Sequence, residues 1–229
     1  MKIKIFADGP DLNQIKKLKG INGYTFNPSL FRKLKVKNYL NFTKKITNLV
    51  NKKSVSIEVI GDDNQTCLEQ AKKISMISKN IFIKIPIMFT NGVSSKKVIK
   101  KLHEQRIKLN ITAIFTFKQC KEIYSLINNK TPIILSIFAG RLYDIGIDPT
   151  NEIKKIKMLY RNKKNVKLLW ASCRMPYDIK KAEKIGCDII TMPVDMILKL
   201  KKFNSSPLKY SKETVKQFYL DAKKSNFKI

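Results

Sequence analysis

One lysine stands inside a strongly apolar stretch of the chain. Lys84 lies between Ile83 and Ile85 in the segment Ile-Phe-Ile-Lys-Ile-Pro-Ile, residues 81–87. An amine in apolar surroundings loses the solvation of its ammonium form, which leaves more of the neutral amine available. A neutral amine attacks carbonyl carbons to form a Schiff base. The segment therefore predicts carbonyl chemistry at Lys84, with a solubilising lysine on an edge strand as the alternative.

Two carboxylates and two arginines stand near the ends of other apolar segments. Asp8 and Glu58 are suited to general acid–base catalysis, although a lone carboxylate more often caps a helix or faces solvent. Arg141 and Arg174 would clamp a phosphate group if both point into the same site. The alternative for each arginine is an ordinary surface ion pair.

Other chemistries find little support. The single histidine, His103, falls on the polar face of an expected helix, which argues against two-histidine metal sites and most nucleophile–histidine pairs. The four cysteines lie far apart without a C-x-x-C pair, so we expect reduced thiols and no zinc site. Asp62 and Asp63 are expected to open a helix, and Cys173 beside Arg174 to be a small packing residue.

Short β-rich segments alternate with longer amphipathic segments along the whole chain. We expect strands over residues 2–7, 23–26, 54–59, 81–87, 109–114, 133–138, 166–171 and 188–192. We expect helices over residues 11–19, 38–50, 64–78, 95–105, 118–127, 150–161, 177–185 and 194–202, with a further helix over 212–223. This alternation, without an internal linker, predicts a single α/β domain over residues 1–229 that forms a (β/α)8 TIM barrel. An open doubly wound sheet is the alternative, although the chain lacks G-x-G-x-x-G.

In such a barrel the active site forms at the carboxyl ends of the strands. The polar residues expected at those ends are Asp8, Thr25, Asn27, Glu58, Lys84, Asn110, Thr112, Ser136, Arg141, Ser172 and Arg174. Trp170, Phe218 and Tyr219 are expected in the core or in an interface. The last helix lies beyond the barrel and is expected to pack on it or on a neighbouring subunit, and we expect a homo-oligomer.

The chain of 229 residues carries a net charge of +30, from 47 Lys+Arg against 17 Asp+Glu. Such a charge makes nucleic acid the first partner to consider. Only five of the 47 basic residues are Arg, and the lysines are spread from end to end, which favours a solvated lysine surface over a specific nucleic-acid face. The alternative of another class is a non-catalytic, basic nucleic-acid-binding protein, whose binding would be salt-sensitive and would involve no Schiff base.

No apolar run approaches the roughly 18–20 residues of a membrane span. Lys4 and Asp8 interrupt the apolar stretch that a signal peptide needs. We therefore expect a cytoplasmic protein without membrane contact.

Six short motifs occur in a fixed order along the expected strands. They are Asp8 at the end of the first strand, Gly-Tyr-Thr-Phe-Asn-Pro-Ser (23–29), Ile-Lys-Ile-Pro (83–86), Leu-Asn-Ile-Thr (109–112), Ser-Ile-Phe-Ala-Gly-Arg (136–141) and Ala-Ser-Cys-Arg (171–174). In this order and spacing the chain resembles the transaldolase family, which includes the fructose-6-phosphate aldolases. The resemblance covers essentially the whole chain. It implies a barrel of the Schiff-base aldolase type that needs no metal or organic cofactor, because the lysine iminium itself accepts the electrons.

The resemblance also implies a role for each matching residue. Lys84 attacks the C2 ketone of a ketose phosphate, and Asp8 removes the C4 hydroxyl proton as the C3–C4 bond breaks. Glu58 and Thr112 hold the water of carbinolamine dehydration. The dihydroxyacetone part of the substrate is expected to contact Thr25, Asn27, Asn110 and Ser136. The phosphate is expected to contact Arg141, Ser172 and Arg174.

Two residues bear on the reaction type. The fructose-6-phosphate aldolases of the family carry glutamine and tyrosine where this chain has Glu58 and Phe138. The resemblance therefore favours transfer of dihydroxyacetone from sedoheptulose 7-phosphate or fructose 6-phosphate to glyceraldehyde 3-phosphate or erythrose 4-phosphate. The alternative is a fructose-6-phosphate aldolase-like or pathway-specific sugar aldolase. Gly9-Pro10, Phe26 and Cys173 depart from the family pattern, which bears on substrate identity more than on the covalent step.

Overall fold

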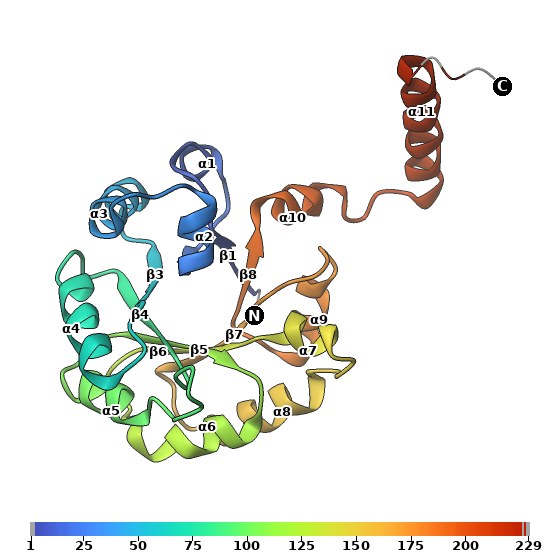
Figure 1. Cartoon of the computed structure of the whole chain (residues 1–229). Coiled ribbons are helices and arrows are strands. Elements are labelled where there is room, and N and C mark those ends of the chain that lie inside the picture. Colours follow the sequence, from blue (N-terminus) through green and yellow to red (C-terminus); the bar gives the residue numbers. More distant parts are fainter. Residues whose placement is uncertain (1–2, 226, 228–229) are drawn as a thin grey trace.

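The computed structural model describes residues 3–225 and 227. Its strands pair in parallel in chain order, and β8 pairs with β1 to close a barrel (Figure 1). The strands are β1 (Lys4–Asp8), β2 (Gly23–Phe26), β3 (Ser54–Glu58), β4 (Ile81–Pro86), β5 (Leu109–Ile114), β6 (Ile133–Ile137), β7 (Val166–Trp170) and β8 (Ile189–Pro193). The closed sheet confirms the predicted (β/α)8 barrel.

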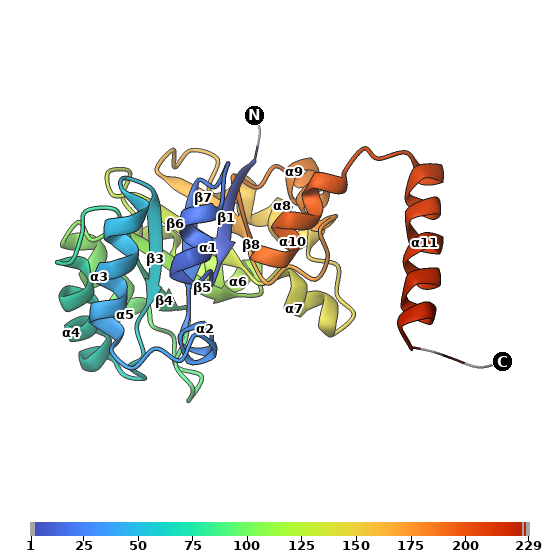
Figure 2. The ribbon, with the colours of Figure 1, turned by 90° about the horizontal axis from the view of Figure 1, so that it is seen from above.

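Helices follow the strands and surround the barrel (Figures 1 and 2). They are α1 (Leu12–Lys17), α2 (Pro28–Lys33), α3 (Tyr39–Val50), α4 (Asn64–Ser75), α5 (Lys96–Glu104), α6 (Phe117–Ile123), α7 (Ala139–Asp144), α8 (Thr150–Leu159), α9 (Asp178–Ile185), α10 (Val194–Lys199) and α11 (Pro207–Ser225). Two 3-10 turns, η1 (Tyr124–Leu126) and η2 (Leu200–Lys202), extend α6 and α10. Within the described part of the chain, no helix has the length and hydropathy needed to span a bilayer.

The sequence did not predict α2 and α7, which follow β2 and β6. Asn27 caps α2 by accepting a hydrogen bond from the main-chain N–H of Leu30 at 2.8 Å, and Pro28 takes the first helical position. Each of these helices has six residues, fewer than two turns. A segment that short shows too little helical periodicity to be recognised.

Side chains alternate along each strand between the barrel interior and the surrounding helices. Phe6 lies two residues before Asp8, and Ile134 lies two residues before Ser136. Because strands repeat every two residues, each apolar residue lies one layer below a polar residue of the carboxyl end. The buried cluster that they form is completed by Leu169, Ala171 and Ile189. An apolar layer therefore lies directly beneath the polar residues at the carboxyl end of the barrel.

The structure corrects the prediction for His103, which is buried. It shares the inner face of α5 with Val98, Ile99 and Leu102. Its Nε2 accepts a hydrogen bond from the main-chain N–H of Asn128 at 2.8 Å. Burial lowers the pKa of His103, which keeps the ring neutral and able to accept this bond.

The aromatic residues singled out in the sequence have different environments. Trp170 is fully buried in the core. Phe218 and Tyr219 belong to α11, where their exposed fractions are 67% and 58%, and no described residue of that helix is buried. Figures 1 and 2 both show α11 standing apart from the barrel. In the described chain these two residues therefore lie outside the core.

Candidate active site

Most of the predicted site residues line one cavity of about 100 Å³ at the carboxyl ends of the strands. They are Asp8, Thr25, Asn27, Lys84, Thr112, Ser136, Phe138, Arg141 and Ser172. Ala171 and Thr191 complete the lining. The other predicted residues, Glu58, Asn110 and Arg174, do not line the cavity. Each contacts a lining residue instead, as described below.

The lysine predicted as the nucleophile lies beside a carboxylate. Glu58 and Lys84 are register partners on β3 and β4, so their side chains leave neighbouring strands on the same face. Lys84 Nζ lies 2.9 Å from Glu58 Oε2, and the side chains are only 6% and 15% exposed. The Tyr39 hydroxyl donates to the main-chain carbonyl of Glu58. This arrangement gives the amine an immediate proton acceptor within a site that water barely reaches.

The second carboxylate sits at the end of β1, next to a threonine of β2. Asp8 and Thr25 are register partners, and the Thr25 hydroxyl donates to Asp8 Oδ1 at 2.6 Å. Burial raises the pKa of Asp8, and the nearby Glu58 adds to the rise. The charge of Lys84 and the Thr25 hydrogen bond act in the opposite direction. Asp8 is therefore a stronger base than an exposed aspartate once it is ionised.

A buried polar chain supports one wall of the cavity. Ser136 donates to Asn110 Oδ1 at 2.7 Å, and Asn110 Nδ2 donates to Ser56 Oγ at 3.0 Å. Asn110 is fully buried and lies behind Ser136 rather than on the cavity wall. The structure thus places Asn110 where it orients Ser136.

The remaining residue of the predicted catalytic set, Thr112, lies at an irregularity in β5. The pairing of β5 with β6 shifts between Ile111 and Ile114, and Ala113 takes a positive φ of 56°. Bulges of this kind change the direction in which a side chain points. Thr112 lines the cavity, and its buried Oγ1 has no hydrogen-bond partner among the described residues.

The two arginines of the expected phosphate site differ in their contacts. Arg141 lines the cavity from α7. Arg174 Nε donates to Asp144 Oδ1 at 2.7 Å, and its Nη2 forms an ion pair with Asp144 Oδ2. Its Nη1 donates to the Ser172 carbonyl at 3.3 Å. Asp144 holds one edge of the guanidinium, so Arg174 is oriented beside the cavity rather than on its wall.

Close backbone packing fixes the loop that carries Ser172. A Cβ on Gly140 would lie 1.5 Å from the Ser172 carbonyl oxygen, which only glycine avoids. Ser172 itself has a positive φ of 63°. Cys173, the next residue, is buried, and burial raises its pKa well above that of a free thiol. Cys173 is therefore a packing residue, as predicted.

Sequence reasoning missed three residues of this region. Thr191 is on β8, where its hydroxyl lies 2.6 Å from that of Thr25. A search of the last strand for polar residues near its carboxyl end would have found it. Ser56 and Asp144 were recognisable only from the contacts described above, because neither stands at the end of a predicted strand.

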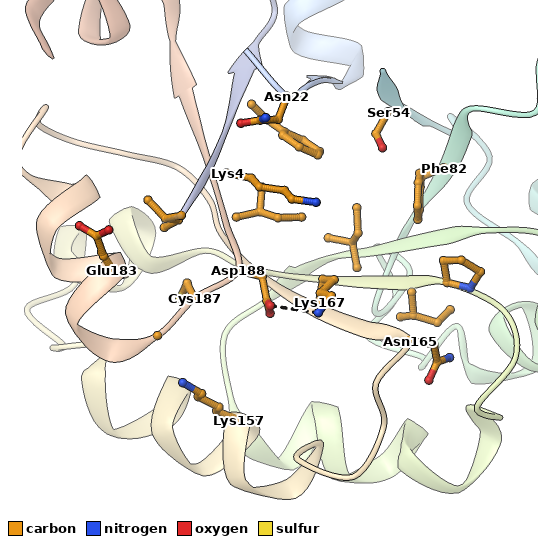
Figure 3. A pocket seen from close by; sticks show the side chains of 17 residues that line it. Lys4, Asn22, Ser54, Phe82, Lys157, Asn165, Lys167, Glu183, Cys187 and Asp188 are labelled. Carbon is orange, nitrogen blue, oxygen red and sulfur yellow. Dashed lines mark ion pairs between the residues drawn. The ribbon is translucent and has the colours of Figure 1, made fainter. Parts of the chain in front are cut away.

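A larger cavity of about 570 Å³ opens at the opposite, amino-terminal end of the strands (Figure 3). Lys4, Lys167 and Asp188 line it, and Lys167 pairs with Asp188 at 3.3 Å. None of the predicted site residues belongs to it. Within the described residues, no three His, Cys, Asp or Glu side chains are grouped closely enough to hold a metal ion.

Comparisons with known proteins bear on the family of the chain. A family model described as transaldolase/fructose-6-phosphate aldolase matches residues 5–229. A probable transaldolase of Thermoanaerobacter sp. (strain X514) is 32% identical over 231 residues, which cover 99% of this chain and 100% of the relative. A probable transaldolase of Nitrosopumilus maritimus (strain SCM1) is 34% identical over 204 residues, which cover 86% of this chain and 87% of the relative.

A solved structure supports the architecture alone. A dihydrodipicolinate synthase matches with a TM-score of 0.60 at 11% identity, covering 86% of this chain and 72% of its own. At that identity the likeness concerns the fold and not the function.

The fold and the site define a class: a (β/α)8 barrel with a buried lysine and two carboxylates grouped at its carboxyl end. The chain belongs to the transaldolase/fructose-6-phosphate aldolase family. Membership confirms the family resemblance drawn from the six sequence features.

Proposed function

We propose that the protein transfers a dihydroxyacetone unit from sedoheptulose 7-phosphate or fructose 6-phosphate to glyceraldehyde 3-phosphate or erythrose 4-phosphate. The unit is carried as a Schiff base on Lys84. The observation that carries the proposal is the grouping of Lys84, Glu58 and Asp8 at the carboxyl end of the barrel. Family membership supports the same reaction.

Schiff-base formation begins at the ion pair. Glu58 takes a proton from the Lys84 ammonium group across 2.9 Å, and the free amine attacks the C2 ketone. The resulting carbinolamine loses its hydroxyl group as water when a proton is returned to it, which leaves the iminium. The unpartnered hydroxyl of Thr112 supports the role of holding this water with Glu58.

Bond cleavage needs a base at the C4 hydroxyl group. Ionised Asp8 takes that proton, the electrons of the C3–C4 bond move into the iminium, and an aldose phosphate leaves. The enamine that remains attacks the aldehyde of an acceptor sugar, and Asp8 returns the proton. Hydrolysis of the new iminium releases the product and restores the Lys84 amine.

Donor and acceptor assays test this reaction. We expect sedoheptulose 7-phosphate to form from fructose 6-phosphate only when erythrose 4-phosphate is also present. Glu58 and Phe138 favour this transfer over the aldolase alternative, because the fructose-6-phosphate aldolases carry other residues there. Free dihydroxyacetone accumulating at a comparable rate without an acceptor would instead establish the aldolase alternative.

Arg174→Ala is expected to weaken the binding of substrates that carry a phosphate. We propose that Arg141, Ser172 and Arg174 bind this group, so the loss of a charge-assisted hydrogen bond should raise KM for fructose 6-phosphate roughly ten- to a hundredfold. Steady-state kinetics with fructose 6-phosphate and with unphosphorylated dihydroxyacetone measure the difference. Arg161→Ala, which changes an exposed arginine after α8, is the matched control. An equal loss with both substrates would contradict the phosphate role.

The position of α11 supports a homo-oligomer. Its apolar side chains include Leu208, Val215 and Phe218, which are 81%, 63% and 67% exposed. In proteins most helical stability comes from packing of an apolar face, so this helix of 19 residues is expected to need a partner surface. The loops beyond β6 and β7 expose Ile147 and Tyr177 at the carboxyl end of the barrel. We propose that α11 packs on the barrel of a second copy, where such apolar side chains are available.

The double substitution V215S/F218S is therefore expected to break the assembly while the barrel stays folded. Light scattering coupled to size exclusion gives the mass, and circular dichroism gives the helix content. Lys216→Ser, on the charged side of the same helix, should leave the mass unchanged. A wild-type chain that is monomeric at micromolar concentration would refute the proposed oligomer.

A further inference from the structure

Three side chains from adjacent strands form one hydrogen-bonded row. β1 lies between β2 and β8 in the barrel. The row runs from Asp8 on β1 to Thr25 on β2, and from Thr25 to Thr191 on β8. Thr25 Oγ1 lies 2.6 Å from Asp8 Oδ1 and 2.6 Å from Thr191 Oγ1. Thr25 and Thr191 are 2% and 4% exposed. The two threonines therefore lie beside the carboxylate in the wall of the cavity, almost fully buried.

The direction of the hydrogen bonds in this row follows from the number of protons. An ionised carboxylate only accepts hydrogen bonds, and each threonine hydroxyl has one proton to donate. The proton of Thr25 is used in the bond to Asp8 Oδ1. The second short contact of Thr25 is therefore one in which Thr191 donates and Thr25 accepts. Thr191 fixes the orientation of the hydroxyl group that in turn fixes Asp8.

We infer that Thr191 is a positioning residue for proton transfer by Asp8. It orders Thr25 so that Oδ1 of Asp8 is occupied and Oδ2 is left for the substrate. Among the described residues, the hydrogen bonds to this side chain reach Oδ1 alone. This inference rests on the proposed function, because it assigns the task of moving the C4 hydroxyl proton to Oδ2.

The row also opposes the rise in the pKa of Asp8 that burial causes. A donor that is itself hydrogen-bonded is polarised and binds the carboxylate more strongly. The charged and titratable groups that face Asp8 are Lys84 on β4, Glu58 on β3 and Cys173 after β7. Without the Thr191 hydroxyl, Thr25 is free to turn away from Asp8. The hydrogen bond that lowers the pKa of Asp8 is then weakened, while burial and Glu58 still raise that pKa.

The test compares Thr191→Val, which removes the hydroxyl at nearly constant shape, with Thr191→Ser, which restores it. Thr47→Val on α3 is the matched control, because the Thr47 hydroxyl bonds only its own helix, at the Lys44 carbonyl. We expect Thr191→Val to lower kcat about tenfold and to move the acidic limb of the kcat profile to higher pH. Thr191→Ser should recover most of the rate and the wild-type limb.

Borohydride trapping separates this inference from the proposed function. Lys84 forms its Schiff base without Asp8, so Thr191→Val should still give the adduct with fructose 6-phosphate. A wild-type protein without adduct or turnover refutes the proposed function. An active wild type whose Thr191→Val variant keeps its kcat and its acidic limb refutes the role of Thr191. If Thr191→Val does not fold, Thr191→Ala and Thr191→Ser are compared in its place, with the same two readouts.

Discussion

Lys84→Met is expected to abolish turnover, lowering kcat by roughly 10⁴-fold or more, because it removes the nucleophile on which every later step depends. Methionine matches the length and apolar body of the lysine stem, so the barrel should keep its packing at this buried position. The variant also removes the ion pair that Lys84 forms with Glu58 at 2.9 Å. A coupled transfer assay measures the rate, and circular dichroism checks the fold.

Lys167→Met is the matched control for this change. Lys167 is also a lysine on a barrel strand, but it lines the cavity at the amino-terminal end and pairs with Asp188 (Figure 3). It should retain ordinary activity. If Lys84→Met retained ordinary activity as well, covalent catalysis at this lysine would be excluded.

Asp8→Asn is expected to slow turnover by roughly 10²- to 10⁴-fold and, at neutral pH, to stabilise the fold. Burial raises the pKa of Asp8, so the folded state holds the proton more tightly than the unfolded state. The stability that Asp8 contributes is complete below about pH 4 and is lost as the pH rises through the raised folded pKa. Asparagine never ionises, so it avoids this loss.

Thermal unfolding at pH 8 and at pH 4 measures the stability change. At pH 8 the variant should gain about 0.5–2 kcal/mol over the wild type, and the gain should shrink toward pH 4. Asp62→Asn is the control of opposite sign, because hydrogen bonds from Thr90 lower the pKa of Asp62. That variant should lose stability at pH 8. A lower Tm of Asp8→Asn at pH 8 would show that the buried charge of Asp8 is compensated in the fold.

The strands and their arrangement in a barrel were within reach of the sequence. The β-rich segments have period-2 patterns, and once the barrel is assumed, residues at the carboxyl ends of neighbouring strands must meet. Which of these residues pair is shown by the structure, where Asp8 and Thr25, and Glu58 and Lys84, are register partners. The predicted topology brings the polar residues of the strand ends together, and the family resemblance singles out the catalytic set among them.

Other features depend on contacts that periodicity does not encode. The sequence analysis puts His103 on the polar face of its helix, whereas its spacing from Ile99 and Leu102 puts it on the buried face of α5. Its burial depends on the main-chain N–H of Asn128, a partner 25 residues away. The bond between Arg174 and Asp144 likewise requires α7, a helix too short to be recognised from its sequence.

Trapping with borohydride and fructose 6-phosphate, followed by peptide mapping, tests the central claim most directly. Borohydride reduces an iminium to a stable secondary amine, so the unit transferred by the enzyme becomes a permanent mass label. We predict one dihydroxyacetone-derived adduct, located on Lys84 and absent from Lys84→Met. A folded, active wild type that gives no adduct, or an adduct on another lysine, would contradict the account.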